Sequence, residues 1–206
     1  EKALRDERIV GVAGIAAGSG EEFSGVAKDA LIIGATVFSR VEGCGIFGTD
    51  CLSGFDSDII EAMEYVYELR DEYNISSLNL SLGGAVHTDL ESSIEEYKPW
   101  QEAAANLRAV GIAVIAASGN NGDSTGIVGP ACTPEMISVG ATTKSDGISS
   151  FSNSSELLDI LAPGSNINSS IVGGYATKSG TSMATPQVTG AWAVMNIEKK
   201  LERTKK

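Results

Sequence analysis

The segment Gly180-Thr181-Ser182-Met183-Ala184 has the residue types and spacing of a nucleophilic site at the start of a helix. A serine at a helix N-terminus lies beside unpaired backbone N–H groups and the positive end of the helix dipole, which stabilise an oxyanion. Pro186 costs little in the first turns, because the early N–H groups have no helical partner. Local chemistry leaves two interpretations open: a residue that caps the helix, which is the commoner case, or a nucleophile at Ser182.

Hydrophobic strands that alternate with helices must position this segment. Such an order predicts an α/β fold, in which a parallel sheet is covered by helices on both faces. Ligands of these sheets bind at the carboxyl ends of the strands, which selects the glycine-rich segments 83–84, 118–122 and 180–183. The expected strands are 30–38, 77–82, 112–117, 136–141 and 157–161, the expected helices are 56–73, 91–110 and 181–200, and 169–178 is expected to form a hairpin.

Several motifs occur together in the order in which one protein family has them. The segment GTSMATPQVTG at 180–190 is similar to the nucleophile motif of the subtilases, the subtilisin-like serine proteases. The other matching motifs are NLSLGG at 79–84, AASGN at 116–120, ISVGA at 137–141, SFSN at 150–153 and LAPG at 161–164. The resemblance runs from Val12 to Met195. It implies a subtilisin-like parallel sheet with helices on both faces, and residues 1–206 as a single, incomplete subtilase catalytic domain that is truncated at both ends.

The resemblance implies a serine endopeptidase that hydrolyses peptide bonds through an acyl-enzyme at Ser182. Ser182 resembles the serine that attacks the scissile carbonyl. The Asn120 side chain and the Ser182 backbone N–H would hold the tetrahedral oxyanion. Taken alone, Asn120 is better explained as a turn residue before Asn121-Gly122, and only the accompanying motifs favour the oxyanion role.

Two further segments are implied to bind the substrate. One would hydrogen-bond an extended peptide by strand addition, and the other would form the opposite wall of the pocket for the side chain that precedes the scissile bond. The residues are Ser81, Leu82 and Gly83 in the first segment and Ala117, Ser118 and Gly119 in the second. Because the second segment consists of small residues, it predicts a roomy and mainly apolar pocket without a fixed counter-charge.

The general base that such a serine needs is missing from its family position. A serine hydroxyl is a weak nucleophile at neutral pH, and the family activates it with a His that an Asp orients. The segment VAGIAAG at 12–18 fits the later part of the family's His motif, which places Arg8 at the position of the catalytic His. Arg keeps its proton at any relevant pH and cannot act as a base. The strand with the Asp would precede residue 1, so we expect this chain to be inactive alone.

Two other function classes remain open. The first is a non-catalytic pseudoprotease that binds peptides along Ser81–Gly83. The second is a doubly wound domain that binds phosphates, but the chain has neither a Gly-x-x-x-x-Gly-Lys-[Ser/Thr] motif nor a dinucleotide fingerprint after its first strand. The single histidine, His87, is expected to be an exposed loop residue and not a substitute base.

Charge and hydropathy exclude some partners. With 15 Lys and Arg against 27 Asp and Glu, the net charge of −12 gives no electrostatic reason to bind nucleic acid or anionic lipid. No segment reaches the roughly 20 apolar residues of a membrane span. We therefore expect a monomer that acts on peptide or protein substrates, with neither nucleic acid nor membrane as a partner. We expect the acidic face of the 56–73 helix, formed by Glu61, Glu64, Glu68, Asp71 and Glu72, to be solvated.

Three cysteines bear on the cellular compartment. Cys44 and Cys51 flank a glycine-containing loop and can close a small disulfide, which is typical of a secreted protein, or they are two reduced thiols. Cys132 is either a buried free thiol or the partner of a cysteine that this chain lacks. We expect a disulfide and an extracellular, secreted protein.

A metal site is not assignable from the sequence. Calcium is common in the subtilases, and Asn121, Asp123 and Ser124 are oxygen donors in one loop. Ca²⁺ prefers six to eight oxygen ligands, so these residues are a weak signal. We expect no metal and no cofactor.

Overall fold

A parallel sheet lies at the centre of the fold. The computed structural model describes residues 7–21, 23–43 and 50–204. The four strands of the sheet lie in the order β3 (Ser77–Leu80), β5 (Ala113–Ala117), β7 (Ile137–Thr142) and β8 (Ile160–Pro163), and every neighbouring pair is parallel. The predicted α/β fold is confirmed, and so are the strands expected at 77–82, 112–117, 136–141 and 157–161, to within a few residues.

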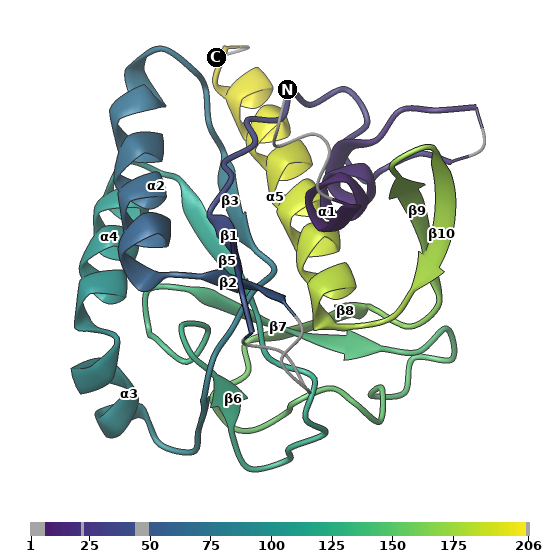
Figure 1. Ribbon diagram of the computed structural model, residues 1–206. Coiled ribbons are helices and arrows are strands. Elements are labelled where there is room, and N and C mark those ends of the chain that lie inside the picture. Colours follow the sequence, from purple (N-terminus) through teal and green to yellow (C-terminus); the bar gives the residue numbers. More distant parts are fainter. Residues whose placement is uncertain (1–6, 22, 44–49, 205–206) are drawn as a thin grey trace.

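Helices cover both faces of this sheet (Figure 1). Helices α2 (Asp56–Glu68) and α4 (Lys98–Ala109) lie on one face, and α5 (Thr181–Thr204) and α1 (Glu7–Ala17) lie on the other. The central strand β5 serves both faces, because successive side chains of a strand point in opposite directions. Its Val114 and Ala116 pack in the core below α2 and α4, whereas Ala113 and Ile115 pack in the core below α5.

Short antiparallel pairs and helices complete the described chain. The pairs are β1 (Phe38–Val41) with β2 (Cys51–Gly54), β4 (Val86–His87) with β6 (Ile127–Val128), and β9 (Ile167–Ile171) with β10 (Gly174–Lys178). The last pair confirms the predicted hairpin. The predicted helical region 91–110 divides into α3 (Leu90–Glu96) and α4, while α2 is followed by the 3₁₀ turn η3 (Leu69–Asp71). None of the described helices is long and apolar enough to cross a membrane.

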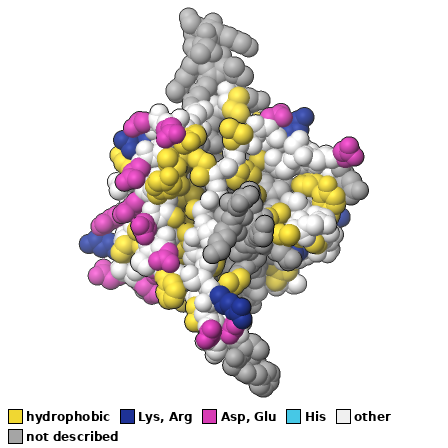
Figure 2. Space-filling view, turned by 45° about the horizontal axis from the view of Figure 1, so that its top comes forward, with side chains coloured by type: hydrophobic (Ala, Val, Ile, Leu, Met, Phe, Trp, Pro, Cys, Tyr) yellow, Lys and Arg dark blue, Asp and Glu magenta, His cyan; other side chains and the backbone are white. Residues whose placement is uncertain are grey.

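The outer face of α2 is acidic and solvated. Ile59, Met63 and Val66 point into the core, which leaves the predicted acidic face outside, and its five carboxylate side chains are all exposed. In Figure 2, acidic side chains gather along the flank of the molecule on which α2 lies.

The prediction of a strand at 30–38 is wrong. Residues 31–37 lie outside any helix or strand, and the Leu31 side chain is 95% exposed. Only Phe38 begins a strand, and this strand pairs antiparallel with β2 and not with the parallel sheet. An apolar, β-branched segment becomes a strand only when a neighbour completes its hydrogen bonds, and in the described part of the chain β3 is the last strand of the sheet on its side.

Candidate active site

Ser182 lies in the first turn of α5, beside the segment that follows β3. Its Oγ donates a hydrogen bond to the Ser81 carbonyl oxygen at 3.3 Å, and the Ser81 Oγ donates to the Ser182 carbonyl oxygen at 3.0 Å. The Ser182 carbonyl is free to accept this bond because the residue four positions later is Pro186, which has no N–H. The paired hydrogen bonds fasten the start of α5 to residues that lie 101 positions earlier in the chain.

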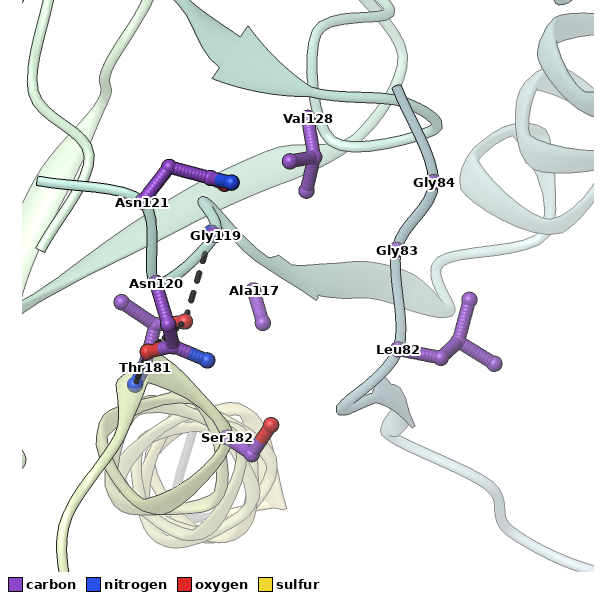
Figure 3. A pocket seen from close by; sticks show the side chains of 10 residues that line it. All are labelled: Leu82, Gly83, Gly84, Ala117, Gly119, Asn120, Asn121, Val128, Thr181 and Ser182. Carbon is purple, nitrogen blue, oxygen red and sulfur yellow. Dashed lines mark hydrogen bonds between the residues drawn. The ribbon is translucent and has the colours of Figure 1, made fainter. Parts of the chain in front are cut away.

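The Asn120 side chain has its two ends in different environments. Its Oδ1 accepts hydrogen bonds from the Thr181 backbone N–H at 2.8 Å and from the Thr181 Oγ1 at 3.2 Å, so that it caps α5. With the oxygen held there, the Nδ2 group points into the cavity beside Ser182 (Figure 3). The Ser182 N–H belongs to the first turn, whose N–H groups have no intrahelical acceptor. Two N–H donors therefore flank the Ser182 hydroxyl, as an oxyanion site requires.

These residues share one pocket with a volume of about 160 Å³. It is lined by Leu82, Gly83, Gly84, Ala117, Gly119, Asn120, Asn121, Val128, Thr181 and Ser182 (Figure 3). The fold thus brings together six of the residues that the sequence singled out, because the segments after β3 and β5 and the start of α5 meet at one edge of the sheet. Ser81 contacts Ser182 through hydrogen bonds without lining the pocket.

Ser118 does not line the pocket. Its side chain is fully buried, and its Oγ donates a hydrogen bond to the Asn153 carbonyl oxygen at 3.0 Å. Its backbone N–H donates to the Val139 carbonyl oxygen of β7, also at 3.0 Å. Since alternate residues at a strand end face opposite sides, the wall that was predicted from three residues is formed by Ala117 and Gly119 alone.

Asn153 shapes the site from below, and sequence reasoning gave it no role. Its side chain is fully buried, and Oδ1 accepts hydrogen bonds from the N–H groups of Asn121 at 2.9 Å and Asp123 at 3.1 Å. Its Nδ2 donates to the Asn121 Oδ1 at 3.2 Å. The only sequence signal was its place in the SFSN motif. Asn153 holds the loop that carries Asn120.

Gly119 and Val128 determine how closely the two walls of the pocket approach each other. Gly119 has a φ of 109°, and a Cβ atom there would lie 2.5 Å from the Asn153 Nδ2 and 2.7 Å from the Val128 Cγ1, so only glycine fits. Val128 is 4% exposed and comes from the two-residue strand β6. Sequence reasoning missed Val128, because a strand of two residues has no recognisable periodicity.

The backbone of Leu82 and Gly83 is available to a ligand. β3 pairs with β5 only as far as Leu80, and Gly84 donates its N–H to the Gly129 carbonyl oxygen at 2.8 Å. Between these points, Leu82 and Gly83 make no backbone hydrogen bond with the described part of the chain. Unpaired N–H and C=O groups beside a pocket are what strand addition uses.

The prediction of an exposed loop histidine is wrong. His87 lies in β4, is 8% exposed, and stacks edge-on against Tyr97 at a centroid distance of 5.2 Å. Its Nε2 lies 3.8 Å from the Glu96 Oε2 and has no hydrogen-bond partner within the described residues. His87 does not line the pocket that contains Ser182. The hydrophobic neighbours of β4 and β6 bury it, which a loop interpretation of the sequence does not anticipate.

Of the predictions for the cysteines, one is confirmed and one stays open. Cys132 is a buried free thiol, and burial raises its pKa. Cys44 lies outside the described residues, so the Cys44–Cys51 disulfide stays a prediction.

Arg8 belongs to helix α1. The backbone carbonyls of Val10 and Gly11 in this helix accept hydrogen bonds from the hydroxyls of Ser170 and Ser169 in β9.

Two of the oxygens considered for calcium accept hydrogen bonds within the described residues. The Asp123 Oδ1 accepts hydrogen bonds from the Thr125 hydroxyl and N–H and from the Gly126 N–H. These bonds, the Thr125 hydroxyl first, hold the pKa of Asp123 below its usual value. The Asn121 Oδ1 accepts from Asn153. The described residues contain no group of three or more His, Cys, Asp or Glu side chains placed to hold a metal, and the expectation of no metal stays a prediction.

Comparison with known proteins decides the family. Residues 10–202 match the Subtilase family. The chain belongs to this family. A solved structure described as a cold adapted subtilisin-like serine proteinase superimposes with a TM-score of 0.72 at 35% identity, over 93% of this chain and 61% of that chain.

Curated relatives of this subtilase chain are proteinases of fungi and bacteria. Proteinase R of Parengyodontium album is 37% identical over 171 residues, which are 79% of this chain and 42% of that protein. An extracellular serine proteinase of Thermus sp. (strain Rt41A) is 35% identical over 169 residues, which are 79% of this chain and 38% of that protein. The chain therefore matches about two fifths of the length of these relatives.

Proposed function

We propose that this chain carries the nucleophile half of a serine endopeptidase site that acts on peptides or proteins. One observation carries the proposal: the Ser182 hydroxyl and the Asn120 amide group face one pocket whose wall includes the free backbone of Leu82 and Gly83. Membership of the subtilase family supports the same chemistry. The residues 1–206 then form one partial catalytic domain.

In this proposal, an extended peptide pairs with the backbone at Leu82 and Gly83 and places a carbonyl carbon beside Ser182. The Ser182 Oγ attacks that carbon, the proton of the hydroxyl passes to a base, and the Asn120 Nδ2 and Ser182 N–H groups stabilise the oxyanion. As the intermediate collapses, the protonated base gives this proton to the leaving nitrogen, so that the C–N bond breaks, a neutral amine departs and an acyl-enzyme remains. The base then takes a proton from water, which attacks the acyl carbon, and returns it to the Ser182 Oγ as the ester bond breaks. In the free chain the Ser182 hydroxyl donates a hydrogen bond to the Ser81 backbone carbonyl, which is too weak a base to remove the proton for catalysis.

The base must come from outside residues 1–206. The single histidine of the chain is buried against Tyr97 and does not line the pocket, and Arg8 occupies the family position of the catalytic His. We propose that a polypeptide segment with an Asp and a His completes the site, and that this chain alone is inactive.

Fluorophosphonate labelling tests this proposal, because the probe modifies an activated serine. The chain alone should remain unlabelled, whereas a longer polypeptide that includes the Asp and His segments encoded upstream of residue 1 should be labelled at Ser182. Ser182→Ala in the longer polypeptide is the control that should abolish labelling. Labelling of the chain alone that is lost on His87→Ala would show instead that His87 is the base.

The second candidate is a pseudoprotease that binds peptides without cleaving them, and the Arg8 position favours it. The two candidates differ in one result: if no Asp and His segments are encoded upstream, or if the longer polypeptide resists the probe while peptides still bind, the site is a binding site. We further propose a secreted monomer without a cofactor and with a Cys44–Cys51 disulfide, in line with the Thermus relative that is named extracellular.

A further inference from the structure

The end of the pocket opposite Ser182 is closed by the Val128 side chain (Figure 3). We infer that Val128 restricts this pocket to small side chains, so that the peptide residue beside Ser182 is Ala, Gly or Ser and not an aromatic or a large aliphatic residue. This inference rests on the proposed function, because it assumes that the pocket receives a peptide. It reverses the roomy pocket that the small residues of the wall predicted.

Val128 spans the pocket from wall to wall. A Cβ atom at Gly83 would lie 2.4 Å from the Val128 Cγ2, and one at Gly119 would lie 2.7 Å from the Val128 Cγ1. The Cγ2 methyl group therefore lies against the backbone of one wall, at Gly83, and the Cγ1 methyl group lies against the backbone of the other, at Gly119. Between Val128 and Ser182, the pocket is bounded by Ala117 and by the glycine backbone on either side.

Val128 cannot move aside easily. Its backbone N–H donates to the Ser118 carbonyl oxygen at 2.9 Å, and the next residue, Gly129, donates its N–H to the Ala85 carbonyl oxygen at 2.9 Å. Strand β6 also pairs with β4 through Val86. Because χ1 of a β-branched residue has few accessible rotamers, a phenyl ring can enter only if the backbone shifts.

The pocket has a volume of about 160 Å³, and the Val128 side chain closes the end that a bound side chain would enter. One methylene too many in a hydrophobic pocket changes the discrimination between two ligands by roughly 10-fold to 200-fold. The expected preference for alanine over phenylalanine is therefore at least about tenfold.

Two peptides that differ only in their last residue test the inference: N-acetyl-Ala-Ala-Ala and N-acetyl-Ala-Ala-Phe, each with a free carboxylate. The carboxylate can lie between the Asn120 Nδ2 and the start of α5, where backbone N–H groups bind anions. Titration of the full chain, followed by the NMR shifts of the Gly83 and Gly119 amides, gives both dissociation constants. The alanine peptide should bind at least about tenfold more tightly.

Val128→Gly should remove this preference by lowering the dissociation constant of the phenylalanine peptide at least about tenfold, with little change for the alanine peptide. Val128→Ala, which keeps the Cβ atom, should have an intermediate effect and carries the test if the glycine variant does not fold. Val139→Ala is the matched control, because Val139 is fully buried below α5 and does not line the pocket.

Two results would overturn the inference alone: equal or tighter binding of the phenylalanine peptide by the unaltered chain, or a peptide preference that neither Val128 variant changes. A different result would overturn the proposed function as well. If neither peptide shifts the Gly83 and Gly119 amides, in the unaltered chain or in Val128→Gly, the pocket does not receive peptides.

Discussion

Single residues at this site make two kinds of contact at once. Asn120 caps α5 with its side-chain oxygen and presents its side-chain nitrogen to the pocket. The Ser81 hydroxyl donates to the Ser182 carbonyl, while the Ser81 backbone carbonyl accepts from the Ser182 hydroxyl. Asn153 serves only the structure, since it is buried below the loop and does not line the pocket. Substitutions at these positions can therefore separate the stability of the site from its chemistry.

The two ends of Asn120 are separable by substitution. Asn120→Ala removes the cap of α5 and should lower the free energy of unfolding by about 1 kcal/mol. Asn120→Asp keeps the acceptor oxygen and adds a negative charge at a helix N-terminus, so its free energy of unfolding should remain within about 0.5 kcal/mol of the unaltered chain. Urea denaturation measures both, and an equal loss in the two variants would contradict the capping role. Neither variant keeps the Nδ2 donor.

Asn153→Ala should lower the free energy of unfolding by about 3 kcal/mol, because it removes hydrogen bonds to two backbone N–H groups and to Asn121 in a fully buried place. Asn106→Ala, at an exposed position of α4, is the control and should change stability by less than about 0.5 kcal/mol. Urea denaturation of the two variants decides the matter. If Asn153→Ala lowers the free energy of unfolding no more than Asn106→Ala does, the Asn153 side chain is not what stabilises the loop.

Whole elements support the pocket by packing behind it. Tyr97 precedes α4 and lies below the segment that forms one wall, since a Cβ atom at Gly129 would lie 2.1 Å from its ring. Burial, and to a smaller degree the charge of Glu96, raises the pKa of Tyr97 to about 12. The side chain is thus held in its neutral form by the contact between α4 and the loops after β3 and β6.

The raised pKa of Tyr97 predicts a loss of stability at alkaline pH. In the unfolded chain the phenol ionises near its usual pKa of about 10, whereas the folded chain holds the proton up to about 12. The contribution of Tyr97 is therefore complete below pH about 10 and declines as the pH rises towards about 12. Urea denaturation at pH of about 9 and about 11 should show this decline. In Tyr97→Phe, the free energy of unfolding should decline less between these two pH values. An equal decline in that variant would show that other groups cause the loss of stability.

The molecule as a whole consists of a well-packed sheet with one incomplete side. Residues in β5 and β7 are almost entirely buried between the two helix layers. By contrast, the apolar residues Leu31, Ile32 and Ile33 are 95%, 49% and 47% exposed, on a segment without secondary structure. Local stability should therefore differ strongly between these parts of the chain.

Hydrogen exchange measures this difference. Amides 31–37 should exchange at close to the rate of an unfolded peptide, because the described structure pairs none of them in a sheet, whereas amides 113–117 of β5 should exchange only through global unfolding. Strand β9 of the hairpin provides a control with intermediate burial. Strong protection of 31–37 in the isolated chain would show that the segment forms a strand after all.

The sequence by itself determined the features that depend on local pattern. Alternating strands and helices predicted the parallel sheet, and the glycine-rich segments after the strands predicted where Ser182, Asn120 and Gly83 would meet. These predictions succeed because strand ends, helix starts and glycine turns are encoded within a few neighbouring residues. The tertiary structure alone decided the rest. Segment 31–37 has no neighbouring strand among the described residues, and His87 of β4 is buried against Tyr97. Val128 lines the pocket from β6, and Asn153 holds the loop beside it. Each of these outcomes depends on whether residues far apart in the chain come into contact, which no local pattern contains.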